Sequence, residues 1–79
     1  SDSALIDKIL NELKNIYSDE DINDIDGVKI SFEDRREWVH LRRSNTEPII
    51  RIYAESQTME SAEKLAEEII AIADKIIKG

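Results

Sequence analysis

Cations, hydroxyls and a turn-forming amide are crowded into one stretch near the middle of the sequence, Leu41 to Arg51, which reads L-R-R-S-N-T-E-P-I-I-R. Arginine presents paired, planar donors that match the oxygens of a phosphate. Ser44 and Thr46 add hydroxyl donors, and Asn45 tolerates the left-handed backbone angles that turn successive N–H groups toward one point. These residue types in this order favour an anion site, most naturally one for phosphate.

The same residues are also ordinary turn formers, because Ser and Thr hydroxyls often hydrogen-bond to their own backbone. Pro48 biases Glu47 toward an extended backbone, so the chain should leave the loop as a strand. Short motifs carry a high risk of chance matches. From the residues alone, a plain connection between two strands therefore stays open beside the phosphate site.

Charge limits what such a site could hold. The 79 residues have a net charge of −7, which argues against nucleic acid as a partner, because polyanions are held mainly by clustered cations. Several of the basic residues are nevertheless clustered in the sequence. Four of the eleven lie close together and a fifth follows soon after: Arg35, Arg36, Arg42, Arg43 and Arg51. One basic spot on an acidic body suits capture of a small anion.

Length, hydropathy and cysteine content set further bounds. The chain is long enough for a single domain, residues 1–79, with one modest core. It has no apolar run that could span a membrane and no signal-peptide pattern at its start. It has no cysteine, which fits a reducing compartment. We therefore predict a cytoplasmic location without a membrane partner.

The elements that must position the loop follow from hydrophobic periodicity. Apolar residues at helical spacing predict one amphipathic helix over 3–17 and a longer one over 59–77, with Thr58 as its N-cap. Alternating segments between the helices predict four strands, beginning with a short, irregular edge strand that buries Ile22 and Ile25. The order helix, four strands, helix predicts an α+β fold with both helices on one face of a mainly antiparallel sheet.

The opposite face of that sheet should carry Trp38, His40, Arg42, Arg51 and Tyr53. Aromatic and arginine side chains on an open sheet can stack single-stranded RNA bases, with Trp38 and Tyr53 as the stacking residues. A surface that faces a neighbouring domain is the alternative, and the acidic total favours it. His40 is the only histidine and lacks partners at the spacing of a catalytic triad or metal site.

The acidic segment 18–26 invites a calcium hypothesis that its spacing does not support. An EF-hand loop needs a glycine at its sixth place and a glutamate at its twelfth. A loop that starts at Asp19 has Asp24 and Ile30 there, and one that starts at Asp21 has Asp26 and Phe32. We therefore predict no metal site.

The central motif resembles the signature of the C-terminal domain of the phosphohexomutases, the phosphoglucomutase/phosphomannomutase superfamily. That signature is R-x-S-[GN]-T-E-P, two residues, R, a short apolar stretch and an acidic residue. The matching positions are Arg42, Ser44, Asn45, Thr46, Glu47, Pro48, Arg51 and Glu55, with Arg43 on the variable one. Asp26-Gly27-Val28-Lys29-Ile30 and Trp38-Val39 resemble two further family stretches, so the likeness covers about residues 26–77.

The resemblance implies a TATA-binding-protein-like fold and a role in carbohydrate metabolism. Phosphohexomutases are isomerases, intramolecular phosphotransferases that move a phosphoryl group between the 1- and 6-positions of a hexose phosphate. A phosphoserine and Mg²⁺ serve the full-length enzyme, but this chain has neither the serine loop nor the D-x-D-x-D metal loop. The resemblance thus implies a domain that is inert alone, needs no cofactor of its own, and works with a hexose phosphate and the other domains of the same chain.

Its implied task is to grip the non-reacting phosphate while closing over the active-site cleft. Arg42 is then the main charge partner, and Ser44, Asn45 and Thr46 supply further donors. Arg51, Glu47 and Arg43 take supporting roles, with Arg43 either facing the helices or adding positive field. A free-standing anion-binding or interaction module with the same fold stays open as an alternative.

Overall fold

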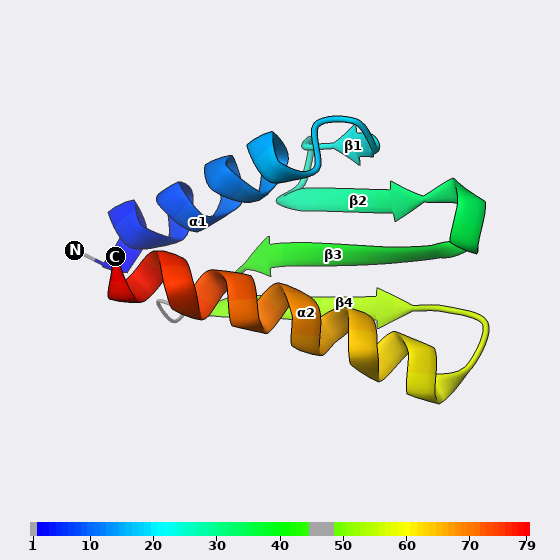
Figure 1. The fold of residues 1–79 in the computed structure, drawn as a ribbon. Coiled ribbons are helices and arrows are strands. Elements are labelled where there is room, and N and C mark those ends of the chain that lie inside the picture. Colours follow the sequence, from blue (N-terminus) through cyan, green and yellow to red (C-terminus); the bar gives the residue numbers. More distant parts are fainter. Residues whose placement is uncertain (1, 45–48) are drawn as a thin grey trace.

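The computed structural model of the protein describes residues 2–44 and 49–79. Two helices enclose the strands in sequence, α1 (Asp2–Ile16) and α2 (Met59–Lys78). The strands are β1 (Asp21–Asn23), β2 (Val28–Phe32), β3 (Glu37–Arg43) and β4 (Ile50–Glu55). They form one sheet in the order β1-β2-β3-β4 with every neighbouring pair antiparallel (Figure 1). The predicted α+β class and order of elements are confirmed.

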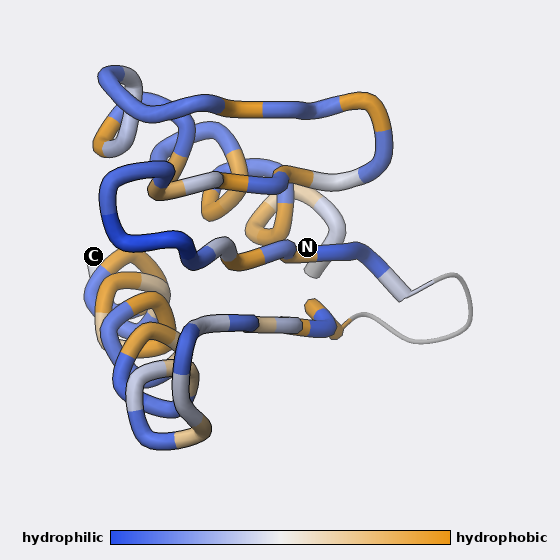
Figure 2. Tube along the Cα trace, turned by 90° about the vertical axis from the view of Figure 1, so that its right-hand side faces the viewer, coloured by the Kyte–Doolittle hydropathy of each residue, from blue (hydrophilic) through white to orange (hydrophobic). Residues whose placement is uncertain are grey.

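Both helices cover the same face of the sheet, α2 over β4 and α1 toward β2 (Figure 1). Alternate strand positions point into this layer, and one stripe of each helix meets them, because side chains repeat every second residue in strands and every 3.6 in helices. Hydrophobic and hydrophilic stretches accordingly alternate along α2 (Figure 2). The most deeply buried side chains come from both layers: Leu13, Ile30, Leu41, Ile69 and Val39.

The segment that follows β1 differs from the prediction. Ile22 is half-buried within β1, but Ile25 is 90% exposed, so the prediction that Ile25 is a buried strand residue is wrong. The reason is a local turn, in which the N–H of Ile25 donates to the side-chain oxygen of Asn23 at 3.0 Å. Such turns compete with strand pairing and end it. Met59, the first residue of the apolar pattern that predicts the helix over 59–77, is likewise 83% exposed at the first turn of α2.

Local backbone conformation and a side-chain hydrogen bond define the turn of the β2–β3 hairpin and the start of α2. The strands are joined by a 3₁₀ turn, Glu33–Arg35, after which Arg36 adopts the left-handed conformation, with φ of 52°. At the start of α2, the Thr58 hydroxyl accepts the N–H of Ser61 at 3.0 Å, which confirms it as the N-cap.

Tyr17 connects the end of α1 to the second helix. Its hydroxyl donates to the Glu68 carboxylate at 2.7 Å, and its ring packs edge-on against Phe32 with 5.5 Å between ring centroids. Burial raises the pKa of Tyr17, and the hydrogen bond and negative charge of Glu68 raise it further.

The raised pKa of Tyr17 predicts a loss of stability in alkali. An unfolded tyrosine loses its proton near pH 10, whereas the folded one keeps it, so the free energy of unfolding should fall as pH rises beyond about 10. Tyr17→Phe should remove that part of the fall, while Tyr53→Phe, on the open face, should keep it. Urea unfolding of the three proteins between about pH 8 and 11 provides the measurement. Parallel curves for the parent chain and Tyr17→Phe would contradict the prediction.

Candidate functional site

The face of the sheet that the helices leave open carries its side chains in cross-strand rows. Antiparallel register places Arg42 opposite Arg51, at the end of the sheet next to the loop. The neighbouring row joins Lys29, His40 and Tyr53. A third row joins Ser31, Trp38 and Glu55. The predicted open-face residues thus do lie together, with the arginine pair nearest the loop.

The arginine pair concentrates positive charge at one point. Directly opposed residues of an antiparallel pair lie close together, and like charges in such positions repel. The Arg42 side chain is 48% exposed, and its Nη2 lies 3.0 Å from the Asp26 carboxylate. Arg51 is exposed and forms no ion pair within residues 2–44 and 49–79. Among the described residues, Asp26 therefore pairs with Arg42 alone, and an anion bound between the two arginines would reduce their repulsion.

The loop itself begins directly beside this pair. Ser44 follows β3, and its backbone N–H donates to the carbonyl oxygen of Ile49 at 3.1 Å. This bond closes the base of the connection, so Ser44 is held beside the two arginines. The predicted donors Asn45 and Thr46, and the predicted supporting residue Glu47, lie outside the described residues, and their roles stay predictions.

Arg43 lies on the other side of the sheet from Arg42. One guanidinium nitrogen donates to the Ser3 hydroxyl at 3.0 Å, and another pairs with the Asp7 carboxylate, both on α1. The sequence left open whether Arg43 faces the helices or adds positive field, and in the structure it faces the helices. Its contacts tie the end of β3 to α1, while Arg42, one residue earlier, faces the open side.

Asp26 and Gly27 are the neighbours of the site whose roles the sequence did not reveal. Gly27 has φ of +70°, and a Cβ placed on it would lie 2.2 Å from the carbonyl oxygen of Leu41. The backbone before β2 is therefore pressed against β3 at the residue that precedes Arg42. The usable sequence signal was the Asp-Gly pair directly before a strand, since glycine permits both the positive φ and the close approach.

Two ring-bearing residues of the open face, Trp38 and His40, are engaged within the chain. The Trp38 Nε1–H donates to the Glu55 carboxylate at 2.8 Å, and the Lys29 ammonium lies 4.6 Å from the centre of the indole ring. The Nε2 of His40 is 2.6 Å from the carbonyl oxygen of Asp26 and must be the donor, because a carbonyl only accepts. These contacts engage Trp38 and His40, whereas Tyr53 is 44% exposed, and none of them favours the RNA alternative.

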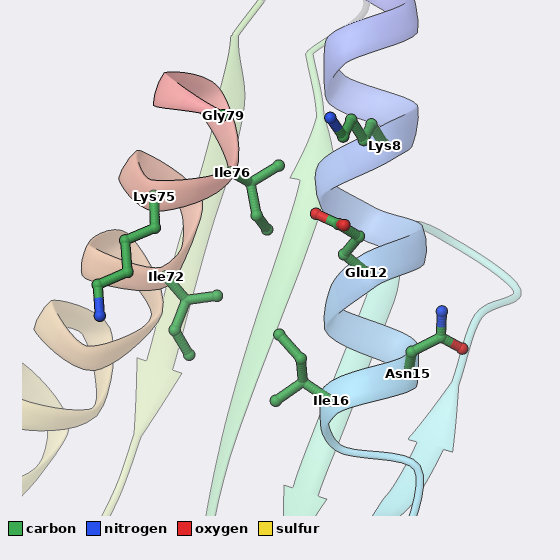
Figure 3. A pocket seen from close by; sticks show the side chains of 8 residues that line it. All are labelled: Lys8, Glu12, Asn15, Ile16, Ile72, Lys75, Ile76 and Gly79. Atoms are coloured by element: carbon green, nitrogen blue, oxygen red, sulfur yellow. The ribbon is translucent and has the colours of Figure 1, made fainter.

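A hollow between the two helices lies away from these residues. It has a volume of about 570 Å³ and is lined only by helix residues and the C-terminal Gly79. Ile16 and Glu12 of α1 and Ile72 and Ile76 of α2 point toward one another across it (Figure 3). No predicted site residue lines it. Within the described part of the chain, no three acidic or histidine side chains gather as ligands for a metal ion.

A protein-family profile described as "Phosphoglucomutase/phosphomannomutase, C-terminal domain" matches residues 3–72. The chain belongs to this phosphohexomutase C-terminal domain family. The matched region includes nearly all of α1, the whole sheet and most of α2, and therefore the arginine pair and the loop. The resemblance of the central motif to this family is confirmed.

Curated relatives agree with the family assignment. A "Probable phosphoglucosamine mutase" of Methanothermobacter thermautotrophicus is 39% identical over 74 residues, which is 92% of this chain and 16% of the relative. A "Phosphoglucomutase/phosphomannomutase" of Thermococcus kodakarensis is 43% identical over 58 residues, 73% of this chain and 12% of the relative. A "Phosphoglucosamine/phosphogalactosamine mutase" of Sulfurisphaera tokodaii is 36% identical over 77 residues, 95% of this chain and 16% of the relative.

The chain thus spans less than a fifth of each of these phosphohexomutase relatives. None of the helices in the described residues is long and apolar enough to cross a membrane. Membership of the family lends no support to the free-standing module or to the RNA-binding alternative.

Proposed function

We propose that this chain is the C-terminal domain of a longer cytoplasmic phosphohexomutase, where it binds the non-reacting phosphate of a hexose phosphate. The observation that carries the proposal is the opposed pair Arg42–Arg51 beside the loop that Ser44 begins. Two arginines next to a loop rich in hydroxyl and N–H donors offer a phosphate both charge and directed hydrogen bonds.

The names of the relatives support phosphate, rather than one sugar, as the group that is recognised. They include glucosamine, galactosamine, glucose and mannose phosphates. A phosphate on a hexose is what these compounds share. A domain present in all of those relatives would serve them equally by binding the shared group, and the sugar would be selected by other parts of the enzyme.

Binding a phosphate remote from the reaction can contribute to catalysis. Contacts with a non-reacting group can hold the reacting end in position, so that the binding energy also lowers the barrier. As the domain closes over the cleft, Arg42 and Arg51 would fix the distal phosphate and thereby orient the opposite end of the sugar. Phosphoryl transfer itself, with phosphoserine and Mg²⁺, would be the task of the other domains, and this chain would be inert alone.

The length and activity of the native gene product test this proposal. An antibody raised against this domain, used on a lysate of the source cells, should detect a protein several times larger than 9.1 kDa. The immunoprecipitated protein should interconvert hexose 1- and 6-phosphates, and an excess of the free domain should block its capture. A band at about 9.1 kDa, or a larger protein without mutase activity, would contradict the proposal.

A further inference from the structure

Asp26 is the last residue of the acidic segment 18–26, shortly before β2, at a point where the backbone is fixed on two sides. Its carbonyl oxygen accepts the Nε2–H of His40 at 2.6 Å. The next residue, Gly27, is packed so closely against Leu41 that only a glycine fits. The Asp26 carboxylate therefore extends from an anchored backbone, although the side chain itself is 65% exposed.

That carboxylate contacts Arg42 through one terminal guanidinium nitrogen, Nη2, at 3.0 Å. The remaining N–H donors of the fork stay available for another oxyanion, because arginine binds planar groups through more than one nitrogen. A free arginine samples many rotamers, and binding an anion would cost that freedom. Because Asp26 already holds Nη2 of Arg42, less conformational entropy is lost when the anion binds.

We infer that Asp26 is a positioning residue, which holds the Arg42 guanidinium at the loop end of the sheet so that its other donors face the phosphate. The inference rests on the proposed function, since it assigns Asp26 to the same anion site. Nothing in the motif R-x-S-N-T-E-P points to this carboxylate, which comes from a different strand connection.

The negative charge of Asp26 and its contact with Arg42 predict opposite effects of its removal on phosphate binding, which makes the inference testable. A negative charge next to an anion site repels the anion, so by field alone removal of Asp26 would tighten phosphate binding. If Asp26 acts by orienting Arg42, its removal should weaken binding in spite of the added positive charge. The sign of the change therefore separates the two.

The experiment compares Asp26→Ala with Asp24→Ala in the 79-residue chain, with glucosamine 6-phosphate as the probe. Asp24 is a matched control, because it lies in the same segment, carries the same charge and pairs with Lys14 rather than Arg42. We expect Asp26→Ala to raise the Kd about three- to tenfold, Asp24→Ala to leave it unchanged or lower it, and Asp26→Glu to restore most of the affinity.

A second measurement follows Arg42 directly and needs no ligand. The ¹⁵Nε order parameter of Arg42 should fall in Asp26→Ala and stay unchanged in Asp24→Ala, with both variants folded. Equal or tighter binding by Asp26→Ala, or an unchanged Arg42 order parameter, would overturn the inference. Arg42→Ala separates this failure from failure of the site as a whole. If Arg42→Ala binds as well as the parent chain, the proposed function fails, whereas loss of binding only in Arg42→Ala rejects Asp26 alone.

Discussion

Replacing Arg42 by alanine should lower the kcat/KM of the phosphohexomutase that we propose contains this domain by about 10- to 100-fold. The lost contacts are hydrogen bonds from a charged donor, which contribute about 1.5–3 kcal/mol. Because the bound phosphate does not react, the loss should appear in kcat as well as in KM if its binding energy orients the sugar. Steady-state kinetics with the hexose 1-phosphate as the varied substrate measures both constants.

The fold should survive this substitution. The Arg42 side chain lies on the open face, about half exposed, and its ion pair with Asp26 is in solvent, where such pairs add little stability. Arg42→Lys should fall between the parent and Arg42→Ala, since lysine keeps the charge but loses the planar fork. Lys64→Ala is a matched control for the lost positive charge, because Lys64 is exposed on α2. An unchanged kcat/KM in a folded Arg42→Ala enzyme would remove Arg42 from the site.

Replacing Gly27 by alanine should destabilise the fold more than any exposed substitution near the site. The left-handed backbone costs a residue with a Cβ about 1 kcal/mol, and an overpacked position costs about 1–3 kcal/mol more. Here the added Cβ would meet the Leu41 carbonyl oxygen at 2.2 Å, so the backbone must move. We therefore expect a loss of about 2–4 kcal/mol in the free energy of unfolding, measured by urea denaturation.

Gly79→Ala provides the control for the backbone angle alone. Gly79 also has a positive φ, of +77°, but nothing lies within 4 Å of where its Cβ would be. Its substitution should therefore cost about 1 kcal/mol or less. Equal losses for the two variants would mean that the close approach of Gly27 to β3 has no energetic consequence.

The architecture could be predicted from the sequence because the periodicity is regular. Leu13 and Ile69 lie on helical stripes, and Ile30, Val39 and Leu41 lie at alternate strand positions, so their burial follows from spacing alone. Ile25 could not be placed in this way. Its exposure depends on an Asx turn at Asn23, a local hydrogen bond that hydrophobicity does not encode.

The candidate site was predictable only in part. Alternation placed Arg42 and Arg51 on one face, and the register of β3 and β4 makes them direct neighbours. The contact of Asp26 with Arg42 could not be derived, because it joins residues 16 positions apart through a turn geometry that only Gly27 permits. For Arg43 the sequence left two positions open, and its contacts with α1 depend on how that helix lies against the sheet.

The central claim is that the loop end of this sheet binds the phosphate of a hexose phosphate. The most direct test is an NMR titration of the ¹⁵N-labelled chain with glucosamine 6-phosphate. Glucosamine is the matched control, because it is the same sugar without the phosphate. We expect saturable shifts centred on Arg42, Ser44 and Arg51 with the phosphorylated sugar, and none there with the unphosphorylated one. Shifts that are absent, that centre on the hollow between α1 and α2, or that are the same for both sugars would contradict the claim.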